Sequence, residues 1–104
     1  MDNKELKDLL ILLRDYMVEN KDECSGICVL VTNMFLTDII THEQTIALLE
    51  HLSDNLPKRK YALWIDHESP GKYLIAKGQD FCWKPFFLKP RLNWINKQIK
   101  KLES

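Results

Sequence analysis

Three cysteines and three histidines are the side chains of this sequence best suited to hold a metal ion or act as a nucleophile. Cys24 and Cys28 are separated by three residues, and a zinc site would bring such a pair to a second pair of Cys or His. The candidates for that second pair are not paired at ligand spacing: Cys82, His42, His51 and His67. We therefore predict no metal site, with Cys28 as a small core residue and Cys24 as a loop thiol.

No pattern in the sequence indicates a set of catalytic residues. Cys24 precedes a predicted helix start, which favours a thiolate, but nothing identifies its base. His42 and His51 are nine residues apart, which places them on opposite faces of a helix, and both are expected at the surface. The motifs of familiar nucleotide-binding and hydrolytic enzymes are absent. We expect a protein that is not an enzyme and has no cofactor.

Anion binding has a first candidate at Ser25 and Gly26, which open a predicted helix. Free N–H groups at a helix start, with a glycine that permits close approach, can hold a phosphate. The same two residues also suit an ordinary helix N-cap. Both interpretations stay open.

A set of basic and aromatic residues in the second half of the chain is the strongest functional signal. Cations neutralise phosphate and aromatic faces stack on bases, which suits a nucleotide or single-stranded nucleic acid. In such a site Lys72, Lys84 and Arg91 would hold phosphate, and Trp83 or Tyr61 would stack on the base. Most aromatics of a small domain must also fill its core, and we expect Trp64 and Trp94 there. The set comprises Lys58, Arg59, Lys60, Tyr61, Trp64, Lys72, Tyr73, Trp83, Lys84, Lys89, Arg91 and Trp94.

Charge is divided unevenly between the two halves, although the net charge is zero. Residues 1–56 carry eleven acidic and four basic side chains, whereas residues 57–102 carry three acidic and eleven basic ones. The basic half could therefore face an anionic ligand or the acidic half of the same or another copy. With narrow apolar stripes on the first and last helices, this pattern favours a homo-oligomer.

The elements that position these residues are predominantly helical. Apolar residues at helical spacing predict helices over 3–19, 26–37, about 42–55 and about 90–102. The third is expected to carry Ile46, Leu49, Leu52 and Leu56 on its apolar face, and Arg91 of the last is expected to stay solvated. Asp2 or Asn3 is expected to cap the first, Ser25 the second, and Thr41 with Gln44 forms a capping box for the third. Between the third and fourth helices we expect a short β-hairpin or an aromatic-rich loop. The predicted fold is a mainly α, four-helix single domain over residues 1–104.

The cellular setting follows from composition. No secretory signal or apolar run of membrane-spanning length is seen, the cysteine count is odd, and no N-x-Ser/Thr acceptor occurs. These features favour a reducing, cytoplasmic location without membrane contact.

Four short segments resemble parts of small accessory proteins encoded by bacteriophages: Ser25 to Cys28, Ile40 to Glu43, Phe81 to Pro85 and Arg91 to Ile95. The resemblance covers about residues 25–102 and implies a stoichiometric binding protein of the host cytoplasm that counters host defence. Such a protein would sequester a nucleotide-like signal or bind a host defence protein. The alternatives are a nucleic-acid-binding regulator and a protein–protein inhibitor or adaptor with an exposed apolar or acidic patch.

Overall fold

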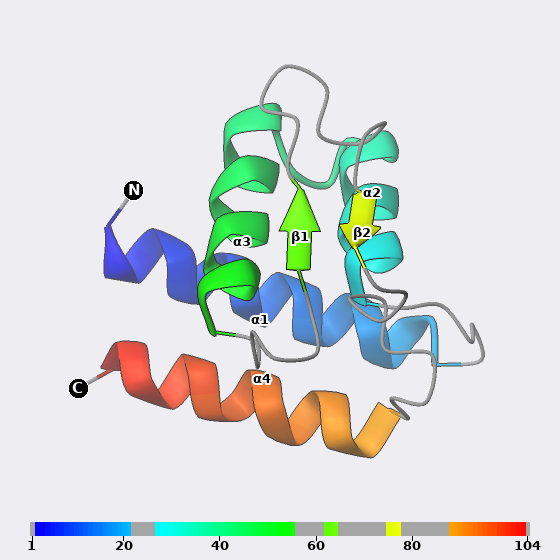
Figure 1. The fold of residues 1–104 in the computed structure, drawn as a ribbon. Coiled ribbons are helices and arrows are strands. Elements are labelled where there is room, and N and C mark those ends of the chain that lie inside the picture. The colour runs from blue at the N-terminus through cyan, green and yellow to red at the C-terminus, as the bar shows by residue number, and fades with distance from the viewer. Residues whose placement is uncertain (1, 22–26, 56–61, 65–74, 78–87, 104) are drawn as a thin grey trace.

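The computed structural model describes residues 2–21, 27–55, 62–64, 75–77 and 88–103. In chain order, its elements are α1 (Asn3–Glu19), α2 (Ile27–Leu36), α3 (His42–Asn55), β1 (Ala62–Trp64), β2 (Ile75–Lys77) and α4 (Leu88–Glu103) (Figure 1). This part of the chain is mainly helical, which confirms the predicted helical class. None of its helices has the length and apolar character needed to cross a membrane.

The ends of the helices follow from local hydrogen bonding. Asp2 caps α1, because its Oδ1 accepts from the Glu5 N–H at 2.8 Å. The predicted capping box of α3 is confirmed: the Gln44 N–H donates to Thr41 Oγ1 at 3.1 Å, and the Thr41 N–H donates to Gln44 Oε1 at 2.9 Å. The predicted bounds 3–19 and 42–55 are confirmed, whereas α2 is shorter and α4 longer than predicted by one or two residues at each end.

A tight turn joins α2 to α3. Asp38 adopts a φ of 60°, and the Ile39 N–H donates back to the Met34 carbonyl at 2.9 Å. This is the Schellman arrangement, in which a residue in the left-handed region ends a helix. The chain then reverses, so that α2 and α3 run antiparallel side by side (Figure 1).

α1 and α4 form the most extensive helix pair and run antiparallel, with the chain termini at the same end of the molecule (Figure 1). Two polar contacts follow this register: Lys7 Nζ lies 3.8 Å from Glu103 Oε1, and Arg14 Nη1 donates to Asn96 Oδ1 at 3.3 Å. α2 and α3 also contact α1. The apolar stripes of α1 and α4 therefore face each other within one chain and are not available for sharing between protomers.

One hydrophobic core draws on all four helices. Its apolar members are fully or almost fully buried, and Trp94 packs against them partly buried. Most of the predicted apolar positions are confirmed, but Ile46 was expected on the buried face and is only partly buried. Leu48 takes its place, because Leu48, Leu49 and Leu52 lie on one face. The core consists of Leu9, Leu10, Leu13, Met17, Leu30, Val31, Met34, Ile40, Leu48, Leu49, Leu52, Ile95 and Ile99.

The two short strands pair antiparallel, with Leu63 opposite Ala76. The turn predicted between them and the aromatic-rich segment predicted before α4 lie outside the described residues.

Candidate functional site

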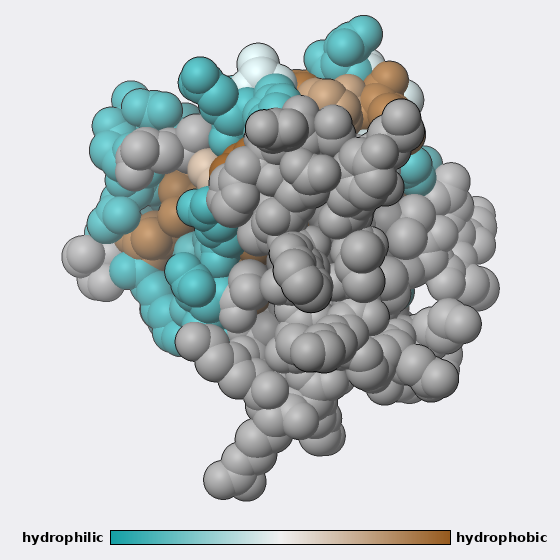
Figure 2. Space-filling model, turned by 45° about the horizontal axis from the view of Figure 1, so that its top comes forward, coloured by the Kyte–Doolittle hydropathy of each residue, from teal (hydrophilic) through white to brown (hydrophobic). Residues whose placement is uncertain are grey.

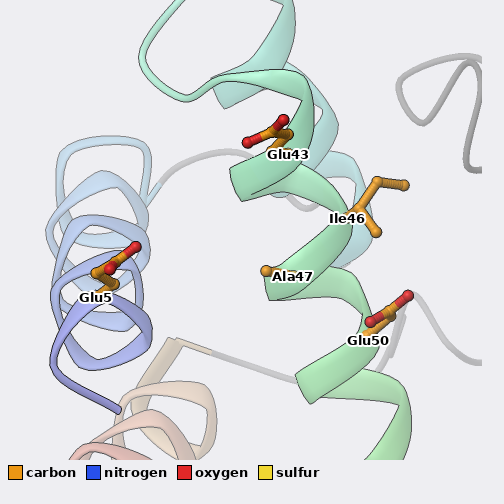
Figure 3. Close-up of a pocket in the computed structure, with 5 residues that line it drawn as sticks. All are labelled: Glu5, Glu43, Ile46, Ala47 and Glu50. Atoms are coloured by element: carbon orange, nitrogen blue, oxygen red, sulfur yellow. The ribbon is translucent and has the colours of Figure 1, made fainter. Parts of the chain in front are cut away.

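A hollow of about 380 Å³ lies between the N-terminal part of α1 and one face of α3. Glu5, Glu43, Ile46, Ala47 and Glu50 line it, and we call it the acidic groove. Figure 3 shows Glu5 on α1 facing α3, with Glu43, Ala47 and Glu50 in a row along α3. All three glutamates are exposed, whereas Ile46 and Ala47 are half-buried. The groove thus combines negative charge at its edges with a small apolar surface.

The sequence places these side chains together through the two helix starts. The Asp2 cap puts Glu5 in the first turn of α1, and the Thr41 capping box puts Glu43 in the first turn of α3. Carboxylates in a first turn are stabilised by the helix dipole. Glu43, Ala47 and Glu50 then follow at i, i+4 and i+7, which is one face of a helix. The small Ala47 side chain leaves space between the glutamates.

This arrangement suits a positively charged ligand. An ammonium or guanidinium group can receive charge-assisted hydrogen bonds from the carboxylates while its aliphatic stem lies against Ile46 and Ala47. The same carboxylates repel phosphate. Within the described residues, no group of three or more Cys, His, Asp or Glu side chains is placed to hold a metal ion.

The residues predicted to bind a nucleotide lie mostly outside the described part of the chain: Ser25, Gly26, Tyr61, Lys72, Trp83 and Lys84. Arg91 is described, and it was predicted to stay solvated on α4. That prediction is wrong, because Arg91 is only 5% exposed and lies on the same face of α4 as Ile95. Its position follows from helical geometry, since residues four apart share a face.

A second group of polar side chains comes from α3 and α4. His51 is partly buried, and Gln98 on α4 is only 4% exposed. Asn55 Nδ2, which can only donate, lies 3.4 Å from His51 Nδ1 and donates to the His51 carbonyl at 2.8 Å. This favours the His51 tautomer with its proton on Nε2. That buried nitrogen and the buried Gln98 Oε1 both lack a well-formed hydrogen bond to another described group, and they are a matching donor and acceptor.

Burial lowers the pKa of His51 below its ordinary value of 6.5. The nearby Lys101 ammonium acts in the same direction, whereas hydrogen bonding with Gln98 and the Asp54 carboxylate oppose the decrease in this pKa. The expectation of two surface histidines is therefore incomplete. His42 also contacts another side chain, since its ring meets Phe35 edge-on at a centroid distance of 6.3 Å.

The acidic groove was not predicted from the sequence, although part of its residue pattern can be read there. The i, i+4, i+7 spacing of Glu43, Ala47 and Glu50 on a predicted helix marks a polar face with a small residue at its centre. The spacing does not predict that Glu5 lies near these residues, because that proximity depends on how α1 packs against α3. Comparison of the chain with protein-family models, curated proteins and solved structures gives no significant match.

Proposed function

We propose that this chain is a non-catalytic protein-binding module that holds a basic segment of a partner protein in the acidic groove. The observation that carries the proposal is the groove itself, in which Glu5 of α1 lies across from the face of α3 that carries Glu43, Ala47 and Glu50 (Figure 3). Of the functions considered from the sequence, the protein–protein inhibitor or adaptor with an acidic patch agrees best with this geometry.

The expected interaction is mainly electrostatic. On the part of the surface coloured in Figure 2, hydrophobic side chains form separate patches among hydrophilic ones. Charge complementarity of this kind accelerates association and confers specificity, and it weakens as salt screens the charges. Following the resemblance to phage accessory proteins, we propose a host defence protein as the partner that supplies the basic segment.

A second candidate function is binding of a nucleotide-like anion by the basic half of the chain. It is supported by α4, which exposes Lys89, Lys97, Lys100 and Lys101. A ligand of this class would bind away from the acidic groove, so substitutions in the groove would leave its affinity unchanged. Nucleic-acid binding on the same lysines would show a steep dependence on salt.

A peptide titration tests the proposed function. A fluorescent peptide that alternates lysine with leucine is titrated with the protein at low salt, beside a peptide with glutamate in place of lysine. We expect the lysine peptide alone to bind. The double variant Glu5→Gln and Glu43→Gln should weaken it about tenfold, which corresponds to about 1.4 kcal/mol.

The matched control removes two exposed carboxylates of α1 that do not line the groove, through Asp15→Asn and Glu19→Gln. This variant has the same net charge as the groove variant and should bind the lysine peptide as the wild type does. Equal losses in the two variants would show that overall charge, and not the groove, holds the peptide. Binding of nucleotides with no binding of the lysine peptide would favour the second candidate.

A further inference from the structure

The described surface carries opposite charges on different helices. The acidic groove gathers three glutamates from α1 and α3. α4 has five basic residues and one acidic residue, and four of its lysines are exposed. Glu103, the one acidic residue of α4, lies next to Lys7 of α1. Each copy of the chain therefore presents both a site for cations and a source of cations.

The lysines of α4 are arranged to enter a groove of this size. Lys97, Lys100 and Lys101 fall at i, i+3 and i+4, so they follow one another along about 6 Å of helix. Glu43 and Glu50 are seven residues apart, or about 10.5 Å along α3. The lysine row thus fits between the two ends of the acidic row. Ile95 and Ile99 hold the opposite face of α4 in the core, so the lysine row faces outwards.

Both surfaces lie towards the same end of the molecule. The contact of 3.8 Å between Lys7 and Glu103 ties the start of α1 to the end of α4. Figure 1 shows the two termini at that end. A two-fold axis near that end would let the lysine row of each copy meet the groove of the other. Such a contact is used twice and closes at two copies.

We propose that a second copy of this chain occupies the acidic groove, with Lys97 and Lys100 of its α4 as the basic segment. This inference rests on the proposed function and names one partner for the same groove. The charge of the whole chain favours it: the net charge is zero and the isoelectric point is about 6.8, so two copies do not repel each other near neutral pH.

Sedimentation velocity of the full chain, at about 50 mM and about 500 mM salt, tests the pairing. We expect a dimer at low salt whose dissociation constant rises at least tenfold at high salt. Two charge-reversed variants, Glu5→Lys with Glu43→Lys and Lys97→Glu with Lys100→Glu, should each be monomeric. An equimolar mixture of the two should form a heterodimer, because one contact then keeps its wild-type charges and the other is restored with its signs exchanged. Circular dichroism of each variant confirms its helical content.

The control variant Asp15→Asn with Glu19→Gln should still form the dimer. A wild-type chain that stays monomeric at low salt, or a mixture that fails to form the heterodimer, would overturn the inference. The lysine-peptide titration separates the two levels of the proposal. A monomer that binds the peptide through Glu5 and Glu43 removes the second copy but leaves the proposed function, whereas a monomer that does not bind it removes both.

Discussion

α1 and α4 pack against each other, yet they bury different kinds of side chain. The buried face of α1 consists of Leu9, Leu10, Leu13 and Met17, all of them apolar. The buried face of α4 joins Ile95 and Ile99 to the polar side chains of Arg91 and Gln98. Two helices of similar length in the same pair are thus held by different mixtures of forces.

Apolar burial alone explains the buried face of α1, but it does not explain the buried face of α4. Removing apolar area from water is favourable and has little directional preference, so it fixes which face of α1 turns inwards. A buried polar group carries an added requirement, because it costs free energy unless it is hydrogen-bonded. For Gln98 the matching group is His51 of α3, so α4 buries a polar side chain near α3 as well as its isoleucines.

The largest effect on the free energy of unfolding is expected at the apolar buried face of α1. Leu13 is fully buried, and Leu13→Ala should lower the free energy of unfolding by about 2–5 kcal/mol, through lost burial and a residual cavity. Urea denaturation in about 0.5 M salt measures it, since self-association is then screened and does not add to stability.

The control for that measurement is the adjacent residue of the same helix. Leu12 is 42% exposed, so Leu12→Ala should cost well under half as much. Similar losses for Leu12→Ala and Leu13→Ala would contradict the assignment of the buried face of α1.

On the polar side, Gln98→Met replaces a buried amide by an apolar side chain of similar length. It should lower the free energy of unfolding by about 1–3 kcal/mol, because it leaves the buried His51 Nε2–H beside an apolar side chain in place of the amide oxygen. His51→Leu alone should have a comparable cost. The double variant should cost less than the two single costs combined, since neither polar group is then left without its match. Strict additivity would show that the two side chains do not interact.

The same pair predicts a dependence of stability on pH. Burial lowers the pKa of His51 in the folded chain below the unfolded value of about 6.5, so the unfolded chain takes up this proton first as the pH falls. The contribution of neutral His51 is complete above about pH 6.5 and is lost as the pH falls from there through the lowered pKa. Urea denaturation over this range should therefore show the wild type losing stability relative to His51→Gln. Parallel curves for the two proteins would contradict the role of His51.

The local parts of the fold could be predicted because they depend on near neighbours in sequence. The limits of α1 and α3 followed from their apolar spacing together with capping residues at their starts, and the Thr41–Gln44 capping box was found in the structure with both of its hydrogen bonds. The inward face of α1 followed from the same periodicity, with Leu9, Leu10 and Met17 buried.

The parts that sequence reasoning missed depend on contacts between helices. Arg91 was predicted to be solvated with the lysines of α4, whereas its position four residues before Ile95 puts it on the inward face of this helix. The pairing of His51 with Gln98, and of Glu5 with the glutamates of α3, joins residues far apart in the chain. No periodicity within one helix encodes such neighbours, because they are set by the packing of one helix on another.

The smallest effect on the free energy of unfolding is expected at the exposed edges of α1 and α4, away from their buried faces. Lys7 and Glu103 are 3.8 Å apart with side chains 31% and 54% exposed, so water and salt screen their attraction. Lys7→Met keeps most of the aliphatic stem and should change the free energy of unfolding by at most about 0.5 kcal/mol. Denaturation at low and high salt should show any such difference shrinking as salt rises. A loss above about 1.5 kcal/mol would mean that this surface pair, and not the buried faces, fixes the register of α1 on α4. The expected small loss would instead leave the orientation of α4 to Ile95, Ile99 and the buried Gln98 beside His51.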